Sequence, residues 1–351
     1  WKRVTGVQTC ALPIYSVADD NVFTTPETEL ELYGPKLAEV TPEACTEALR
    51  AAWSVPQRHV LVVGNAQIEG DAPAVVAQAY ERAKAEPVAA PAKIAEAAFS
   101  YTEFGPAGTV TESRRVEDLD ATLITFANGV RLNLKKTDFE ANQVHVAVRI
   151  GNGQLTEPKN QPGLSVFATS TFIAGGLGRH SADDLQRLLA GKTLGTNFAV
   201  NDDALALSGS TNREDLLLQL QLLAAYITDP GYRPEALRQI RKAIEPYYNQ
   251  LAHVPQGPLM LEVPRLLASG DARFGLPPRE VLLSRTQEES KAWLAPQLAE
   301  GAVEIAIVGD IDLDATVAAV ARTFGALPKR GERPAFAAER VVKFPDQPFT
   351  R

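Results

Sequence analysis

The sequence has little cysteine, methionine or histidine: two, one and four residues among 351. Two cysteines exclude a disulfide-built scaffold and a four-cysteine zinc site. No apolar run approaches the roughly 20 residues that a transmembrane helix needs, so no membrane span is expected. Basic residues are not in excess either, since 35 Lys and Arg stand against 43 Asp and Glu. The net charge of -8 predicts no nucleic-acid partner. The remaining composition, 45% hydrophobic, is typical of a soluble globular protein.

Residues 1–14 are interpreted as an artefact and are excluded from the fold prediction. The stretch Val4–Ile14, VTGVQTCALPI, back-translates to a string that resembles a common sequencing-library adapter. Cys10 belongs to this stretch, which leaves Cys45 as the one native cysteine. Native protein would then begin near Tyr15, and we expect the chain to be a fragment of a longer protein.

A helix–strand unit occurs twice, at an offset of 245 residues and without a gap. The first copy reads TPEACTEALRAAWSVPQRHVLVVGN from Thr41, and the second reads TQEESKAWLAPQLAEGAVEIAIVGD from Thr286. Each copy predicts a capped helix, a short buried strand and then a further helix, Ala72–Ala83 or Asp314–Phe324. The matched positions include Leu49 and Leu294, Val60 and Ile305, Val62 and Ile307, and Gly64 and Gly309.

The repeat sets the expected domain organisation. If it is real, the chain contains the end of one domain and the whole of a similar one. The stretch between them is rich in Ala and Pro, as linkers are. The predicted segments are 15–70 (end of a preceding domain), 71–119 (linker), 120–329 (complete domain) and 330–351 (linker and start of a next domain).

Within the complete domain, the patterns alternate between strands and helices. Asn128-Gly129 predicts a tight turn after a strand, and Val144–Ile150 alternates as a second, half-buried strand does. A helix is expected at 163–173, a hairpin at 196–210, and a leucine-rich helix follows Asp215. This order predicts an α+β fold, a two-layer sandwich of helices on a mostly antiparallel mixed sheet.

Two stretches, FANGVRLNL and RIGNGQLTEPKNQPGLSVFATSTFIAGG, resemble the repeated domain of the pitrilysin/insulinase peptidases, also called inverzincins. The sequence most resembles the large bacterial members of this family, which have four such domains on one chain. This resemblance implies a LuxS/pitrilysin-like domain fold. The positions that follow the family pattern are Asn128, Gly129, Gly151, Glu157, Gly163 and Leu164.

The sequence departs from the family where an active domain carries H-x-x-E-H. There it has Val166, Thr169 and Ser170. Valine has no lone pair and the two hydroxyls are poor zinc ligands, so no catalytic and no metal-binding residue is predicted here. Glu245, at the position of the family's distal ligand, would stand alone. The histidines include no pair four residues apart; they are His59, His145, His180 and His253.

The resemblance therefore implies the non-catalytic half of a zinc metalloendopeptidase, inactive alone, that encloses peptide substrate against the catalytic half of the same chain. Zinc would be a cofactor of that other half only, and a bacterial protein of this type would be periplasmic. The glycine-rich stretch IAGGLGRH is a candidate substrate-binding loop, and its alternative is a helix terminator and connector. The candidate residues are Gly175, Gly176, Gly178 and Arg179.

Alternative interpretations remain at this point. An inactive pitrilysin-fold structural or assembly subunit would share every feature above. An unrelated nucleotide-binding enzyme is suggested by Gly151–Gly153, and it would require a mainly parallel sheet. His180–Asp184, HSADD, is either a metal cluster or a helix start capped by Ser181.

Overall fold

The structure is a computed structural model in which the chain divides into two compact units, residues 1–92 (unit 1) and 93–351 (unit 2). Each unit is described by itself. The expected artefact at residues 1–14 lies outside the described residues. The structure describes residues 22, 24–54, 57–65, 67–88 and 98–348.

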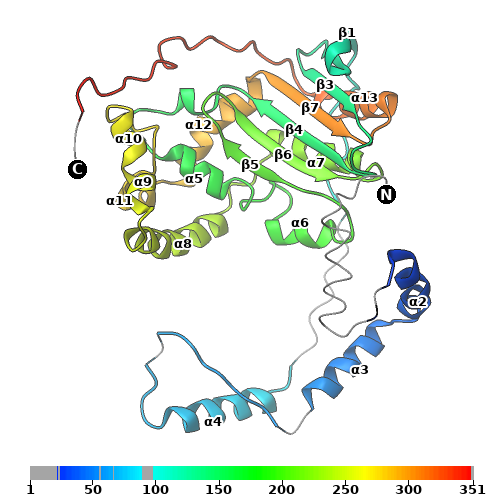
Figure 1. Cartoon of the computed structure of the whole chain (residues 1–351), viewed down its shortest axis with the longest axis vertical. Coiled ribbons are helices and arrows are strands. Elements are labelled where there is room, and N and C mark those ends of the chain that lie inside the picture. The colour runs from blue at the N-terminus through cyan, green and yellow to red at the C-terminus, as the bar shows by residue number, and fades with distance from the viewer. Residues whose placement is uncertain (1–21, 23, 55–56, 66, 89–97, 349–351) are drawn as a thin grey trace. The chain divides into compact units, whose positions relative to one another are not determined.

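Unit 2 is built on a seven-stranded sheet of order β1-β2-β3-β7-β4-β6-β5 (Figure 1). β7 is parallel to β3 and antiparallel to β4, and the other neighbouring pairs are antiparallel. The predicted α+β fold with a mostly antiparallel mixed sheet is confirmed. The nucleotide-binding interpretation is wrong, because it requires a mainly parallel sheet. The strands are β1 (Val110–Val116), β2 (Ala121–Phe126), β3 (Arg131–Lys136), β4 (Val144–Ile150), β5 (Asn197–Val200), β6 (Leu205–Thr211) and β7 (Val303–Gly309).

One face of the sheet forms the core. In β7, Val303, Ile305 and Ile307 are buried, and the residues between them are half-buried. β4 has the same alternation, since successive strand residues point to opposite faces.

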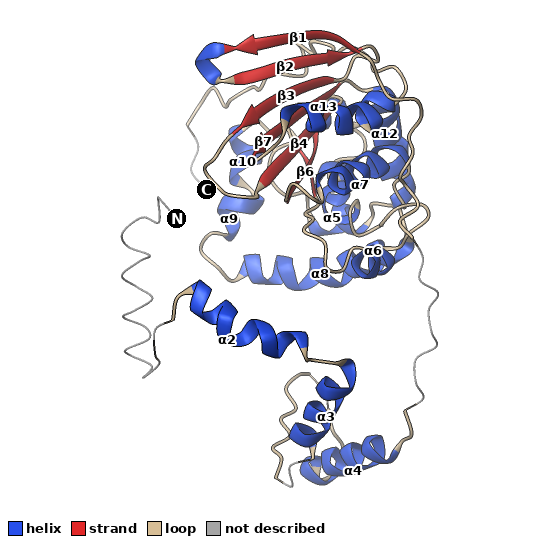
Figure 2. Cartoon of the chain, turned by 90° about the vertical axis from the view of Figure 1, so that its right-hand side faces the viewer, coloured by secondary structure: helices blue, strands red, loops and turns tan. Residues whose placement is uncertain are grey.

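Helices cover the buried face (Figure 2). The leucine-rich α7 packs against β6, α12 and α13, and it is buried on nearly all sides, as an apolar helix in the centre of a domain is. α5 packs against β5, α8, α11 and α12. The helices are α5 (Leu164–Thr171), α6 (Ala182–Leu188), α7 (Leu216–Thr228), α8 (Pro234–Ala252), α9 (Gly257–Leu261), α10 (Val263–Leu267), α11 (Arg279–Leu283), α12 (Gln287–Glu300) and α13 (Leu313–Arg322), with 3-10 turns at Glu117–Leu119, Gly153–Thr156 and Phe324–Ala326.

The stretch 71–119, expected to be a linker, contains two regular elements. Helix α4 occupies Ala72–Ala85, where the repeat predicted a helix, and β1 starts the sheet at Val110, before the expected domain start at residue 120. Composition misled here because β1 is an edge strand whose residues are nearly all exposed. Such a strand lacks the apolar alternation by which strands are recognised.

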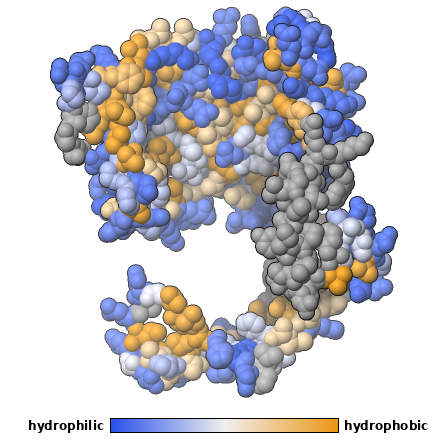
Figure 3. Space-filling view, in the orientation of Figure 1, coloured by the Kyte–Doolittle hydropathy of each residue, from blue (hydrophilic) through white to orange (hydrophobic). Residues whose placement is uncertain are grey.

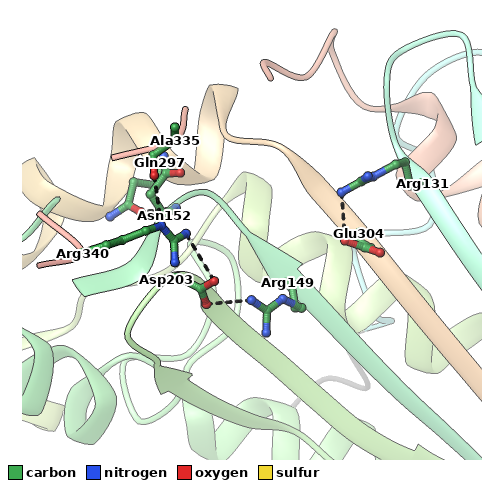
Figure 4. Close-up of polar contacts among 8 residues, drawn as sticks. All are labelled: Arg131, Arg149, Asn152, Asp203, Gln297, Glu304, Ala335 and Arg340. Carbon is green, nitrogen blue, oxygen red and sulfur yellow. Dashed lines mark hydrogen bonds and ion pairs between the residues drawn. The ribbon is translucent and has the colours of Figure 1, made fainter. Parts of the chain in front are cut away.

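Charged residues join neighbouring strands on the other face of the sheet (Figure 4). Arg131 on β3 pairs with Glu304 on β7 at 2.9 Å. Asp203, in the turn between β5 and β6, pairs with Arg149 on β4 at 2.7 Å and with Arg340 at 3.5 Å. Arg340 belongs to the segment after the last helix, so Asp203 ties that segment to the end of the sheet.

Unit 1 consists of α2 (Pro26–Ala38), α3 (Pro42–Trp53) and α4, and none of its described residues is buried. Thr41 caps α3 through the amide of Ala44, as Thr286 caps α12 through the amide of Glu289. The short strand expected in this copy of the repeat is not formed, because residues 57–63 pair with no strand. Among all described residues, no helix combines the length and the apolar character needed to cross a bilayer.

Arg330 was expected in a linker beyond residue 329, but it is part of the packing of unit 2. Its side chain is only 5% exposed. The guanidinium donates hydrogen bonds to the carbonyls of Leu298, Ala299 and Gly301 at 2.7, 2.8 and 2.9 Å. These carbonyls end α12 and have no partner within the helix, so Arg330 acts as its C-terminal cap.

We predict that Arg330→Met lowers the free energy of unfolding of unit 2 by about 3 kcal/mol, because buried carbonyls lose charged donors. The midpoint temperature of thermal unfolding should fall by roughly 5–10 °C. The control is Lys329→Met, since Lys329 is the exposed neighbouring residue. Equal stability of the two variants in denaturant titrations would contradict the capping role.

Candidate functional site

Helix α5 carries the three positions at which an active pitrilysin-type domain has its zinc motif. Val166, at the first position, packs against a hydrophobic cluster formed by residues of α5, α8 and α11. The buried members of this cluster are Phe167, Ile244, Tyr248 and Leu282. The place of an imidazole is therefore taken by an aliphatic contact between helices.

The two hydroxyl residues of this helix make structural hydrogen bonds. Thr169, at the general-base position, accepts the backbone N–H of Val200 at 3.1 Å and so joins α5 to the edge strand β5. Ser170 donates to the carbonyl of Val166 at 2.9 Å, within the same helix. Neither is a general base at neutral pH, and neither is an ordinary zinc ligand.

Glu245 on α8, at the distal-ligand position, forms an ion pair with Arg279 of α11 at 3.1 Å. Arg279 also pairs with Glu280, and these two carboxylates raise its pKa. In the part of the chain that the structure describes, no group of three His, Cys, Asp or Glu side chains is arranged to hold a metal ion. The chemistry of the donors at these positions does not fit catalytic zinc, which needs imidazole or carboxylate ligands.

The glycine-rich loop brings the four candidate substrate-binding residues into one turn. Gly175 and Gly176 are buried, whereas Gly178 and Arg179 are exposed. Leu177 forms a bridge with Pro230. Gly176 has a φ of 64°, and a Cβ on it would lie 2.6 Å from the backbone carbonyl oxygen of His180, so this turn requires glycine.

Arg233 holds this loop from one side. Its guanidinium donates to the carbonyl of Leu177 at 2.5 Å and to that of Gly178 at 2.9 Å. A third, longer bond of 3.4 Å reaches the carbonyl of Gly175. The loop carbonyls are thus tied to the segment that follows α7, which supports the connector interpretation.

Tyr101 and His180 hold the loop from the other side. The Tyr101 hydroxyl donates to Asp229 Oδ2 at 2.6 Å and accepts the amide of Arg179 at 2.9 Å. Burial, together with the Asp229 hydrogen bond, raises the pKa of Tyr101. His180 Nε2 accepts the amide of Ser100 at 3.0 Å. Sequence reasoning missed these partners, because they lie 78 to 128 residues apart in the chain.

Arg179 is the member of the loop whose side chain remains accessible. Its guanidinium lies over the Tyr101 ring, 5.6 Å from the ring centre, while its backbone is fixed by the Tyr101 hydroxyl.

The stretch His180–Asp184 is a helix start, as one of its two interpretations predicted. Ser181 accepts the amide of Asp184, and the Asp184 carboxylate accepts the Ser181 amide, which completes a capping box for α6. Hydrogen bonds from Ser181, with the help of Arg187, lower the pKa of Asp184 to about 2. The Asp184 carboxylate is used in the cap.

No protein-family model matches the sequence, and no match was found among curated proteins. Solved structures match with clear fold similarity. The periplasmic protease PqqL from Escherichia coli aligns over 97% of this chain and 38% of its own, at 18% identity and a TM-score of 0.58. The ferredoxin protease FusC, solved as a mutant in complex with Arabidopsis ferredoxin, aligns over 92% of this chain and 36% of its own, at 14% identity and a TM-score of 0.56.

A third similar structure is a peptidase M16 inactive domain from Pseudomonas fluorescens, which aligns over 62% of this chain and 53% of its own. The identity is 18% and the TM-score is 0.51. The chain has the fold of the M16, pitrilysin-type peptidases, and the predicted LuxS/pitrilysin-like fold is confirmed. It spans little more than a third of the length of PqqL or FusC.

We predict that the purified protein binds no stoichiometric zinc, since α5 offers a methyl surface and two hydroxyls. The triple variant Val166→His, Thr169→Glu, Ser170→His, combined with Arg279→Ala to release Glu245, should gain about one zinc ion per chain. Metal analysis after dialysis measures the zinc content of the unmodified protein and of the variant. Arg279→Ala alone is the control, and stoichiometric zinc in the unmodified protein would contradict the assignment.

Proposed function

We propose that the chain belongs to the M16 metallopeptidases and forms part of the non-catalytic half of a zinc metalloendopeptidase. The observation that carries the proposal is a pitrilysin-type fold in which the metal-binding helix has become a packing element. Val166 contacts the cluster beside α8, and Thr169 bonds to β5. Such a domain keeps its architecture and has no catalytic chemistry of its own.

The proposed task of this half is to enclose peptide substrate against a catalytic half in the same polypeptide. Confinement raises the local concentration of an unfolded peptide beside the zinc and excludes larger folded proteins. The extent of the similar structures supports this arrangement, since PqqL and FusC are each more than twice as long as the part that this chain matches. FusC, a ferredoxin protease of this fold, was solved as a mutant in complex with ferredoxin, so a polypeptide is the class of ligand that we propose.

The glycine-rich loop is the proposed peptide contact within this domain. Its backbone is rigid because Arg233 and Tyr101 hold it, and Arg179 remains accessible at its tip. A fixed cation favours peptides with an acidic residue or a free carboxylate nearby. By similarity to the Escherichia coli enzyme, we propose the periplasm as the location.

An inactive structural or assembly subunit of the same fold is the second candidate. The candidate site residues of α5 all make contacts within the domain. These contacts favour an assembly subunit as much as the non-catalytic half of a peptidase. The two candidates differ in the other half of the polypeptide. A peptidase carries an H-x-x-E-H helix there, and an assembly subunit does not.

The 351-residue protein, incubated with an unfolded fluorogenic peptide, should show no cleavage that 1,10-phenanthroline stops. The reason is that no group of three His, Cys, Asp or Glu side chains among the described residues is arranged to hold the zinc. A catalytically active M16 protease serves as the positive control. Chelator-sensitive cleavage by the isolated protein would refute the assignment of a non-catalytic domain.

In the longer protein that joins this domain to a catalytic half, Arg179→Glu should raise KM by roughly fivefold and leave kcat unchanged, because a surface ion contact of about 1 kcal/mol is lost. Arg241→Glu is the matched control, since Arg241 is exposed on α8. Absence of any cleavage by the longer protein would favour the assembly subunit. An unchanged KM would refute the contact at Arg179.

A further inference from the structure

Three segments of unit 2 that lie far apart in the chain enclose one pocket. They are residues 155–162, which lead into α5, residues 268–273 between α10 and α11, and residues 338–343 of the C-terminal segment. The pocket has a volume of about 520 Å³, within the roughly 300–1,000 Å³ that is typical of small-ligand sites. Neither the glycine-rich loop nor the three motif positions of α5 line it.

Much of the pocket wall is apolar. Val341 is 60% exposed although its side chain is apolar, so the wall that it forms is open to water. Figure 3 shows orange apolar surface on this side of unit 2, over α10. An apolar ligand group that displaces water from such a wall gains free energy. The apolar lining residues include Leu155, Pro158, Pro162, Ala268, Ala338 and Val341.

Arg273 ties the three walls together. Its Nε and Nη2 donate to the Asp271 carboxylate at 3.1 and 2.6 Å. Its Nη1 donates to the carbonyl of Glu339 in the C-terminal segment. Its own carbonyl accepts Gln154 Nε2 at 2.9 Å, which connects the 3-10 turn before α5. The pocket is therefore held open by hydrogen bonds of the protein itself, and a preformed site lowers the entropic cost of binding.

Two of the three carboxylates in the lining are already bound by donors of the protein. Glu157 accepts the amide of Ser165, in the first turn of α5, at 3.2 Å. Asp271 is held by Arg273. Hydrogen bonds from Arg273, with the nearby charge of Lys159, lower the pKa of Asp271. These two carboxylates are consequently not free to bind a cationic ligand.

Two lysines of the lining have no such partner. Lys159 and Lys343 are exposed, and neither forms a hydrogen bond or an ion pair with a described residue. Glu339 is the one lining carboxylate that is equally uncommitted among the described residues. Two free cations against one free carboxylate leave the pocket with an excess of positive charge, which favours an anionic ligand.

We propose that this pocket binds the C-terminal residue of a peptide, with an apolar side chain against the wall and the free carboxylate paired with Lys159 and Lys343. A terminal carboxylate next to an apolar side chain matches both features of the lining. An inorganic anion would leave the apolar wall in water, and a neutral apolar molecule would leave the lysines unpaired. The inference rests on the proposed function only for the source of the peptide, and it adds a second contact to that of Arg179.

Binding is measured on the 351-residue protein, without cleavage. The probe is a short peptide of Gly and Ser that ends in Leu and carries a fluorophore at its N-terminus, and its anisotropy is followed as protein is added. One peptide should bind per chain. The same peptide with a C-terminal amide should bind on the order of 10-fold more weakly, because it loses the charge pairing with both lysines. Equal affinities, or no saturable binding of the acid, overturn the proposal.

Lysine substitutions test the carboxylate contact. Lys159→Met and Lys343→Met should each weaken binding of the acid by roughly fivefold and leave binding of the amide unchanged. Lys242→Met is the matched control, since Lys242 is exposed on α8 and does not line the pocket. Equal weakening of the acid and the amide would overturn the pairing with the carboxylate.

Two neighbouring alanines test the location of the site. Ala338→Trp places a large side chain in the pocket and should lower the affinity on the order of 10-fold or more. Ala337→Trp changes the preceding residue, which does not line the pocket, and should leave the affinity unchanged. Both alanines are exposed, so neither substitution should shift thermal unfolding. Equal affinities of the two variants would overturn the assignment of this pocket.

Competition with N-acetyl-leucine distinguishes a peptide from a small carboxylic acid. Displacement at the same concentration as unlabelled peptide would assign the pocket to a small acid and overturn the proposal, whereas weaker competition supports it. A failed binding test leaves the chelator experiment on the proposed function unaffected. Chelator-sensitive cleavage by the isolated protein would refute the proposed function and leave the binding result intact, so the two failures are distinguishable.

Discussion

The structure depends on the position of β7, a strand that needs a neighbour on each side. β7 hydrogen-bonds to β3 in parallel and to β4 antiparallel, and it buries its apolar face under the helices. Both neighbours come from more than 150 residues earlier in the chain. A helix–strand–helix unit exposes its apolar face until such neighbours arrive. Unit 2 meets this requirement, whereas in the described part of unit 1 residues 57–63 lie between α3 and α4 and pair with no strand.

Helix α5 is a packing element of unit 2. In unit 2, its inner side joins the helices α8 and α11 through a small second core. Its hydroxyl residues bond to β5 and to the helix itself. Buried apolar contacts of this kind stabilise the fold by roughly 25 cal/mol per Å² of apolar surface.

The glycine-rich loop is ordered by groups far from it in sequence. The Tyr101 hydroxyl bonds to the loop amide of Arg179 and to the carboxylate of Asp229, and the Arg233 guanidinium donates to the loop carbonyls. These bonds compensate for the conformational freedom that the glycines would otherwise have. The backbone that carries the exposed Arg179 is consequently fixed by hydrogen bonds to Tyr101 and Arg233.

Local periodicity and side-chain identity were enough to predict the fold class, the strands of the sheet interior, the cap at Ser181 and the lack of imidazole and carboxylate side chains on α5. They were not enough at β1, whose exposed residues have no apolar alternation, or at Arg330, which lies in a charged stretch that resembles a linker. The contact of Tyr101 with Asp229 and the ion pair of Glu245 with Arg279 follow from how distant segments pack, and so does the burial of one copy of the repeat and the exposure of the other. A sequence pattern is local, and two similar local patterns can have different neighbours in the folded chain.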